Sequence, residues 1–205
     1  ARDWNNCGCV VPHNRKTGEW TAAVNMNFGS ALEYALNQGV SLMTGERMGL
    51  DEKPATEMTS FNEVKAAFYR QFDNLCRHSI ILTVEAQRLH REMVPRPFLS
   101  SCIEHCLESG KDLSHGGAQY NIGPVITGIG LAVVANSLAA VKKLVFEDKV
   151  CNMATLANAL QADWQGYEEL QKAAKAAPKY GNDDDYADDI AREIANHFYK
   201  EIHQY

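Results

Sequence analysis

The stretch Asn6-Cys7-Gly8-Cys9-Val10-Val11-Pro12, near the start of the 205-residue chain, is the most informative part of the sequence. Glycine permits a tight bend beside Cys9, and the Val-Val-Pro segment continues in an extended direction. This pattern predicts a thiol at the tip of a loop. A second distinctive segment, Pro178-Lys179-Tyr180-Gly181-Asn182-Asp183-Asp184-Asp185, lies near the other end of the chain.

The composition is that of a globular protein, with 45% hydrophobic and 22% charged residues, and the chain is long enough to form one domain-sized core. The formal net charge of -6 provides no basic field for a phosphate backbone, so a nucleic-acid partner is not expected. The most apolar stretch, residues 124–135, is short and rich in glycine, so no membrane span is predicted. Position 1 is not Met and no secretory signal follows it, so we expect a processed or truncated start.

Six cysteines are too few for a dense disulfide scaffold, and a reducing cytoplasm fits them better. Cys102, His105 and Cys106 have the residue types of a zinc site, but a second ligand pair at finger spacing is missing, so buried structural thiols are favoured. The acidic run 183–185 is more typical of a solvated helix start than of a calcium or magnesium site. No metal is therefore predicted.

The periodicity predicts a mostly helical chain with irregular connections marked by glycine. Ser30 is a candidate N-cap, Ser60 and Glu63 form a candidate capping box, and Pro95 ends the longest helix. Residues 116–124 form a shaped loop, since their glycines and proline favour tight bends. No boundary between two domains is apparent. The expected helices are 30–38, 60–93, 98–109, 132–146, 153–163, 167–176 and 186–203, with short strands near 22–26 and, as an alternative to helix, 98–101.

Several segments, in this order and spacing, resemble the glycyl radical enzymes of the pyruvate formate-lyase-like family, and the resemblance covers essentially the whole chain. The chain is more similar to the dehydratases, decarboxylases and alkylsuccinate synthases of that family than to pyruvate formate-lyase itself, which uses two adjacent cysteines, because Cys9 is followed by Val10. The segments that carry the resemblance are Gly8-Cys9-Val10, residues 31–39, residues 110–112 with 116–121, and residues 177–185.

The resemblance implies an α/β fold in which residues 1–205 form a helix-rich part of a ten-stranded barrel built from two five-stranded half-barrels. It implies that a thiyl radical on Cys9 abstracts hydrogen from a small-molecule substrate. It also implies a stored glycyl radical, a separate radical SAM iron–sulfur activating enzyme that installs it, and a homodimer. Candidate pocket residues are His13, Glu19, Trp20 and Tyr120, with Phe28 as a further aromatic wall.

Two departures from the family pattern limit what the resemblance implies. Many dehydratases and decarboxylases of the family carry a glutamate base two residues after the cysteine, where this chain has Val11, which cannot transfer a proton. The family's C-terminal Arg-Val-x-Gly-Tyr segment does not occur in these residues, so we expect an internal piece that lacks the glycyl radical domain. The leading hypothesis is a radical lyase that cleaves a C–C or C–heteroatom bond in a small organic acid, alcohol or arylacetate. The alternatives are a fumarate-adding synthase and a non-catalytic remnant or split subunit.

Overall fold

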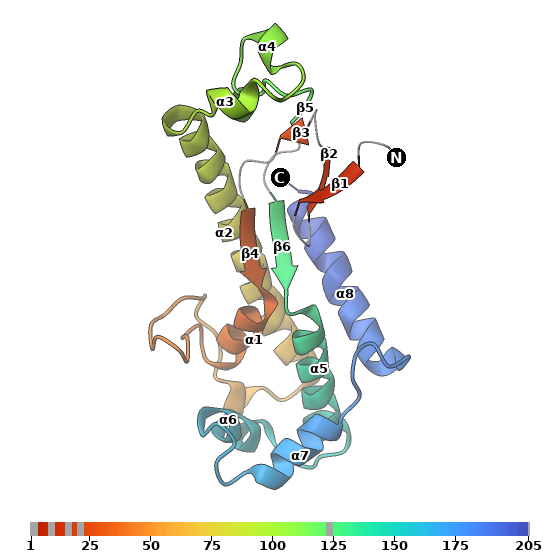
Figure 1. Ribbon diagram of the computed structural model, residues 1–205. Helices are drawn as coiled ribbons and strands as arrows, with labels where there is room; N and C mark the ends of the chain where they lie inside the picture. The colour runs from red at the N-terminus through yellow and green to blue at the C-terminus, as the bar shows by residue number, and fades with distance from the viewer. Residues whose placement is uncertain (1–3, 8–10, 15–17, 20–22, 122–124, 205) are drawn as a thin grey trace. The chain divides into compact units, whose positions relative to one another are not determined.

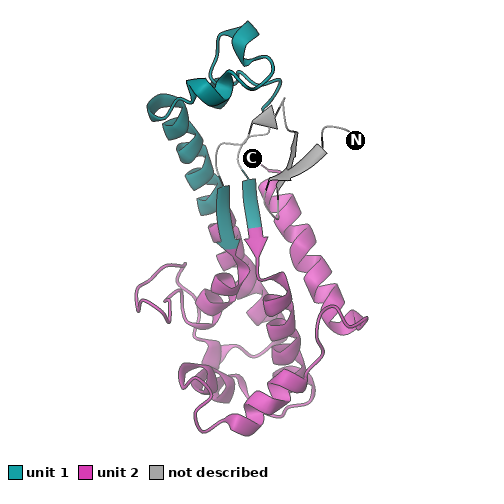
Figure 2. Cartoon of the chain, viewed as in Figure 1, with its two compact units in different colours: residues 1–26, 78–127 teal, residues 27–77, 128–205 magenta. Residues whose placement is uncertain are grey.

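The computed structural model describes residues 4–7, 11–14, 18–19, 23–121 and 125–204 (Figure 1). These residues divide into two compact units, one formed by residues 1–26 and 78–127 and the other by 27–77 and 128–205 (Figure 2). The sequence showed no boundary, and the two units are compact parts defined by contacts within each. The sequence gives no sign of the division because it passes through the helix α2 (Phe61–Met93) and the strand β6 (Val125–Ile129) rather than through a linker.

The second unit, residues 27–77 and 128–205, is helical. The helix α5 packs against α1 and α8, and the unit's fully buried side chains include Phe68, Phe72, Leu138 and Ile194. Its elements are α1 (Phe28–Leu36), η1 (Ala55–Glu57), the first part of α2, α5 (Leu131–Val141), the π-helix η3 (Lys142–Glu147), α6 (Met153–Gln161), α7 (Glu168–Ala176) and α8 (Asp185–Ile202).

The long helix α2 begins and ends close to the predicted residues. Ser60 Oγ accepts a hydrogen bond from the Glu63 amide at 3.3 Å, and Glu63 Oε2 accepts one from the Thr59 amide at 2.9 Å. The capping box is thus present, with its reciprocal bond shifted by one residue. The helix ends two residues before Pro95, which has no amide hydrogen to donate.

Three predictions about local structure need correction. The helix α1 is capped by Asn27, whose Oδ1 accepts from the Gly29 amide at 2.9 Å, and not by Ser30. The expected helix 98–109 is interrupted between α3 (Pro97–Ser100) and α4 (Cys106–Ser109), because His105 adopts a left-handed conformation with φ of 77°. The helix predicted over residues 132–146 is an α-helix only as far as Val141, where α5 is followed by the π-helix η3. The sequence did not indicate this change, since one wider turn hardly alters the spacing of the apolar residues.

Most of the strand residues that the structure describes lie in the first unit, residues 1–26 and 78–127. The strands β1 (Trp4–Cys7) and β2 (Val11–Asn14) form an antiparallel pair, and β3 (Gly18–Glu19) runs parallel to β5 (Tyr120–Asn121). The strand β4 (Ala23–Asn27) pairs with β6, which confirms the strand expected near 22–26. The alternative strand over 98–101 is wrong, because Pro97 opens the short helix α3 there.

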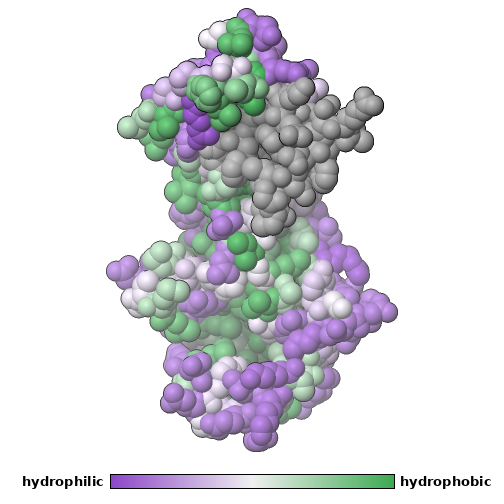
Figure 3. Space-filling view, viewed as in Figure 1, coloured by the Kyte–Doolittle hydropathy of each residue, from purple (hydrophilic) through white to green (hydrophobic). Residues whose placement is uncertain are grey.

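Several large hydrophobic side chains of the first unit are exposed. Phe98 in α3 is 85% exposed, Met93 at the end of α2 72%, and Leu107 in α4 71%. Figure 3 shows hydrophobic side chains at the surface over α3 and α4, interspersed with hydrophilic ones. Covering such side chains with another apolar surface would remove them from water and would be favourable. Among the described residues, no helix is long and apolar enough to cross a membrane.

Candidate active-site region

The predicted catalytic cysteine belongs to the segment that connects β1 to β2. The antiparallel register pairs Asn5 with His13, Asn6 with Pro12 and Cys7 with Val11. Cys9 itself lies in residues 8–10, outside the described residues, and so does Trp20. The structure therefore describes the two strands on either side of the thiol, including the backbone position of His13 opposite Asn5.

The β3–β5 ladder brings together two of the predicted pocket residues. Gly18 pairs with Tyr120 and Glu19 pairs with Asn121 in a parallel register, so Glu19 and Tyr120 lie on neighbouring strands, one register position apart (Figure 1). Tyr120 is 54% exposed. Sequence reasoning proposed both residues for the pocket but missed their pairing, because strands of two residues are too short to show alternation.

Asp112 fixes the loop that leads to Tyr120. Its Oδ2 accepts hydrogen bonds from the Arg96 amide at 2.7 Å and from Ser100 Oγ at 2.8 Å. Its Oδ1 accepts from the Ser114 amide at 2.9 Å and from Ser114 Oγ at 2.5 Å. Ser100 Oγ in turn accepts from the Leu113 amide at 2.9 Å. One carboxylate thus ties the start of α3 to the helical turn η2 (Leu113–His115).

These hydrogen bonds also set the charge of Asp112. Burial acts to raise the pKa of this carboxyl, but the hydrogen bonds from Ser114, Ser100 and the Arg96 amide outweigh burial and lower the pKa below its usual value. Asp112 is therefore a carboxylate at neutral pH. Its role among the described residues is to hold backbone in place, a role that the sequence did not indicate.

Gly117 allows the chain to turn tightly between η2 and β5. A Cβ atom at this position would collide with the backbone oxygen of Lys111 and would lie 2.8 Å from that of Asp112. The Gly117 amide donates to the backbone oxygen of Asp112 at 3.0 Å, and the backbone oxygen of Gly117 lies 3.2 Å from His105 Nδ1. The shaped loop predicted from the glycines is confirmed here, and the close backbone approach explains why only glycine fits.

The alternative zinc site at Cys102, His105 and Cys106 does not form. Within the described parts of the chain, the only cluster of potential ligands close enough to hold a metal lies elsewhere and includes none of the three. Cys106 is buried, and burial, with the charges of Asp112 and Glu108, raises the pKa of its thiol. The structural thiol is thus confirmed for Cys106, whereas Cys102 is exposed.

The acidic run before α8 is a helix start, as predicted. Asp184 is the N-cap and accepts from the Tyr186 amide at 3.0 Å, and Asp188 Oδ1 accepts from the Gly181 amide at 2.9 Å. Lys179 Nζ donates to the Ala174 and Ala177 oxygens at the end of α7. The distinctive segment 178–185 therefore serves to join α7 to α8.

Phe28, the further aromatic residue considered for the pocket, is core. It is 3% exposed and packs edge-on against Phe72 at 4.8 Å and Phe198 at 5.2 Å between ring centroids. A Cβ atom at Gly128 would collide with its ring. Its placement in a substrate pocket is therefore wrong.

The fold and this region define a helix-rich α/β piece with a cysteine between two short paired strands. The whole chain, residues 1–205, matches the pyruvate formate lyase-like family, and it belongs to that family.

Three comparisons illustrate the relationship. The chain is 39% identical to (2S)-3-sulfopropanediol dehydratase of Klebsiella oxytoca over 197 residues, which are 93% of this chain and 23% of that protein. It is 36% identical to trans-4-hydroxy-L-proline dehydratase of Clostridioides difficile over 203 residues, 98% of this chain and 26% of that protein. The glycerol-bound structure of the B12-independent glycerol dehydratase from Clostridium butyricum superposes with a TM-score of 0.88 at 34% identity, covering all of this chain and 26% of that one.

The comparisons confirm the family and the fold class that the sequence predicted. The described helices and strands are a part of a glycyl radical enzyme barrel. The chain spans about a quarter of the length of the curated relatives that it matches.

Proposed function

We propose that the protein is a glycyl radical lyase of the dehydratase type, which cleaves a C–O or other C–heteroatom bond in a small polar substrate. The observation that carries this proposal is the identity of 36–39% to two dehydratases over nearly the whole chain. In the proposed reaction the thiyl radical of Cys9 takes a hydrogen atom from a substrate carbon, the neighbouring leaving group departs as water, and the thiol returns the hydrogen atom to the product radical. The cysteine is thus regenerated.

The β1–β2 pairing supports Cys9 as the radical site. Because Cys7 and Val11 are partners in the ladder, only residues 8–10 connect the two strands, and Cys9 is the middle one. A short connection of this kind suits a thiol that must meet both the stored radical and the substrate. The reaction also requires that water and oxidants be kept away from the radical.

Loss of water requires a proton to reach the departing hydroxyl, and Val11 cannot supply it. We assign this role to Glu19, because its strand β3 is paired with the strand that carries Tyr120, a second candidate pocket residue. Glu19 gives its proton to the departing hydroxyl and takes one back from the substrate radical, so that it too is regenerated. His13, on β2, is the other ionisable candidate near Cys9 in the sequence. Trp20 and Tyr120 complete the proposed pocket.

The family implies the remaining parts of the proposal: a glycyl radical stored outside these residues, a radical SAM iron–sulfur activating enzyme, a homodimer and a cytoplasmic location. The fumarate-adding and remnant alternatives are not favoured, since the relatives described above are dehydratases.

We further propose that residues 1–205 are one part of a larger catalytic domain. The exposed apolar side chains at Met93, Phe98 and Leu107 support this, since further chain that packs on them would remove them from water. A longer reading frame with the Arg-Val-x-Gly-Tyr segment downstream is the expected finding.

A substrate screen tests the proposed reaction. The full-length protein, activated without oxygen, is incubated with vicinal diols, hydroxyproline, hydroxyalkanesulfonates, arylacetates, and a hydrocarbon with fumarate, and products are followed by mass spectrometry. We expect loss of water from a hydroxylated substrate. A fumarate adduct would show that the protein is a fumarate-adding synthase and not a lyase. An activated protein that consumes none of these compounds would also contradict the proposal.

A further inference from the structure

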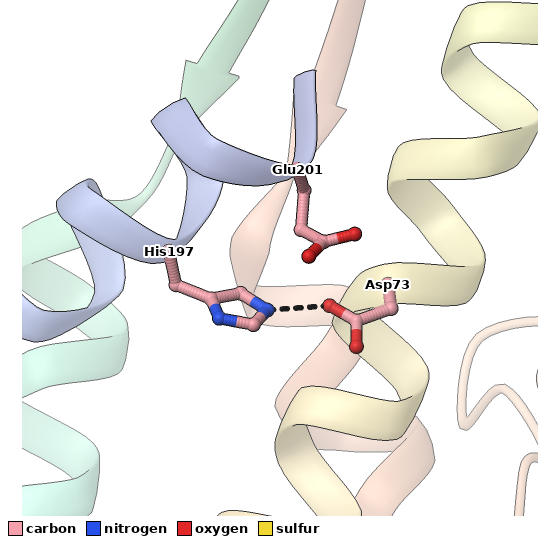
Figure 4. Close-up of side chains that lie close together, drawn as sticks. All are labelled: Asp73, His197 and Glu201. Carbon is pink, nitrogen blue, oxygen red and sulfur yellow. Dashed lines mark hydrogen bonds and ion pairs between the residues drawn. The ribbon is translucent and has the colours of Figure 1, made fainter. Parts of the chain in front are cut away.

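A cluster of three ionisable side chains in the second unit plays no part in the proposed reaction. Asp73 projects from α2, while His197 and Glu201 project from α8 one helical turn apart. Figure 4 shows the three side chains pointing toward one another. One ligand atom from each residue lies within 4.8 Å of the other two.

The imidazole of His197 is held in a fixed orientation. Its Nε2 lies 2.5 Å from Asp73 Oδ1, and its ring lies against Tyr69 with 4.4 Å between ring centroids and against Phe72 with 5.8 Å. The side chains of His197 and Asp73 are 28% and 43% exposed. The cluster is thus ordered by packing and still reachable from solvent.

A contact between helices accounts for Asp73 and His197, but it does not account for the third side chain. The carboxylate of Glu201 is turned toward the same point and is held there by Gln204, whose Nε2 donates to Glu201 Oε1 at 2.8 Å. Two carboxylates this close repel each other, and the repulsion is removed when a cation lies between them.

We propose that Asp73, His197 and Glu201 bind a divalent transition-metal ion of the zinc type, which joins α2 to α8. Zinc takes imidazole nitrogen and carboxylate oxygen at about 2.0–2.2 Å, so two ligands of one tetrahedral ion lie about 3.3–3.6 Å apart. The hydrogen bond of 2.5 Å between His197 Nε2 and Asp73 Oδ1 is shorter than this spacing, so the ion takes the place of that hydrogen bond, and the side chains of Asp73 and Glu201 rotate to admit it. Three protein ligands leave one tetrahedral position for water, and the imidazole favours zinc over magnesium or calcium.

Zinc titration of the full-length protein, first freed of metal with a chelator, tests this site. Bound zinc per chain and the thermal midpoint are measured for the natural protein, for Glu201→Gln and His197→Gln, and for the control His203→Gln. His203 lies just past the same helix, is exposed, and has its Nδ1 2.8 Å from the Tyr199 oxygen. Thiols elsewhere in the chain are the same in all four proteins, so their zinc cancels in the comparison.

We expect the natural protein and His203→Gln to bind one more zinc ion per chain than the other two variants. In these two proteins alone, zinc should raise the thermal midpoint by several degrees, and magnesium should not. Without metal, Glu201→Gln should have the same thermal midpoint as the natural protein, because it keeps the Asp73–His197 contact. Equal zinc content in all four proteins would overturn the site. Neither result depends on whether the protein is a lyase.

Discussion

Replacement of Asp112 by alanine should loosen the loop that carries Tyr120. The carboxylate accepts four hydrogen bonds, two of them from backbone amides. Hydrogen bonds to a charged group contribute about 1.5–3 kcal/mol each, but solvent can replace part of what this half-buried site loses, so we expect a net local loss of about 2–3 kcal/mol. That loss corresponds to roughly 30- to 150-fold more frequent opening of the loop.

Hydrogen exchange read by mass spectrometry measures this opening locally, without requiring the whole protein to unfold in one step. Amides in residues 96–121 should exchange about 30- to 150-fold faster in Asp112→Ala, with a smaller change in Asp112→Asn, which keeps one acceptor oxygen. Asp51→Ala is the control, because Asp51 is 82% exposed and its ion pair with Arg47 contributes little. Unchanged exchange over residues 96–121 in Asp112→Ala would refute the assigned role.

The lowered pKa of Asp112 adds a pH dependence with a definite sign. A carboxyl whose pKa is lower in the folded protein stabilises the fold fully above its unfolded pKa, about 3.9 for aspartate, and loses that contribution as the pH falls further. Protection of residues 96–121, taken as the exchange rate relative to that of an unfolded peptide at the same pH, should therefore fall below about pH 4 in the natural protein. In Asp112→Ala this loss of protection at low pH should be much weaker.

Gly117→Ala should strongly destabilise the same loop, because the new Cβ atom would collide with backbone atoms. Gly110→Ala has open space around the new Cβ atom and strains only the backbone φ of 64°, so it should lower the free energy of unfolding by about 1 kcal/mol. Chemical denaturation of both variants measures the two losses, and equal losses would contradict the steric argument. Gln71→Ala should lower the free energy of unfolding by about 2–4 kcal/mol, since Gln71 is fully buried and bonds both backbone groups of Leu50, and a loss under 1 kcal/mol would be inconsistent with that role. At pH 8 an alkylating reagent should label exposed Cys102 but spare Cys76, whose thiol pKa is raised to about 12 by burial and by the charges of Asp73 and Glu201; labelling of both at one rate in the folded protein would contradict the burial.

The sequence was most informative where local patterns decide the structure. The long helix α2 followed from its apolar spacing, its capping residues and Pro95, and the start of α8 followed from the acidic run. The family followed from short segments in a fixed order, which the comparisons confirmed.

Contacts between residues far apart in the chain were not predictable in the same way. The pairing of Glu19 with Asn121 joins residues about a hundred positions apart through strands too short to show a period. The break in the helix at His105 depends on a left-handed backbone conformation, which the spacing of apolar residues does not reveal. The role of Asp112 depends on hydrogen-bond donors that lie at separate places in the sequence, among them Arg96 and Ser114. The division into two units cuts through continuous elements, where composition carries no signal.

The central claim is that Cys9 carries the reacting radical, and substitution of the two neighbouring cysteines tests it most directly. In full-length protein activated without oxygen, Cys9→Ala should abolish turnover of the substrate found in the screen, while Cys7→Ala, the matched control two residues away, should retain it. Both variants should still accept the stored radical, which electron paramagnetic resonance quantifies. Turnover by Cys9→Ala at the rate of the natural protein would contradict the account.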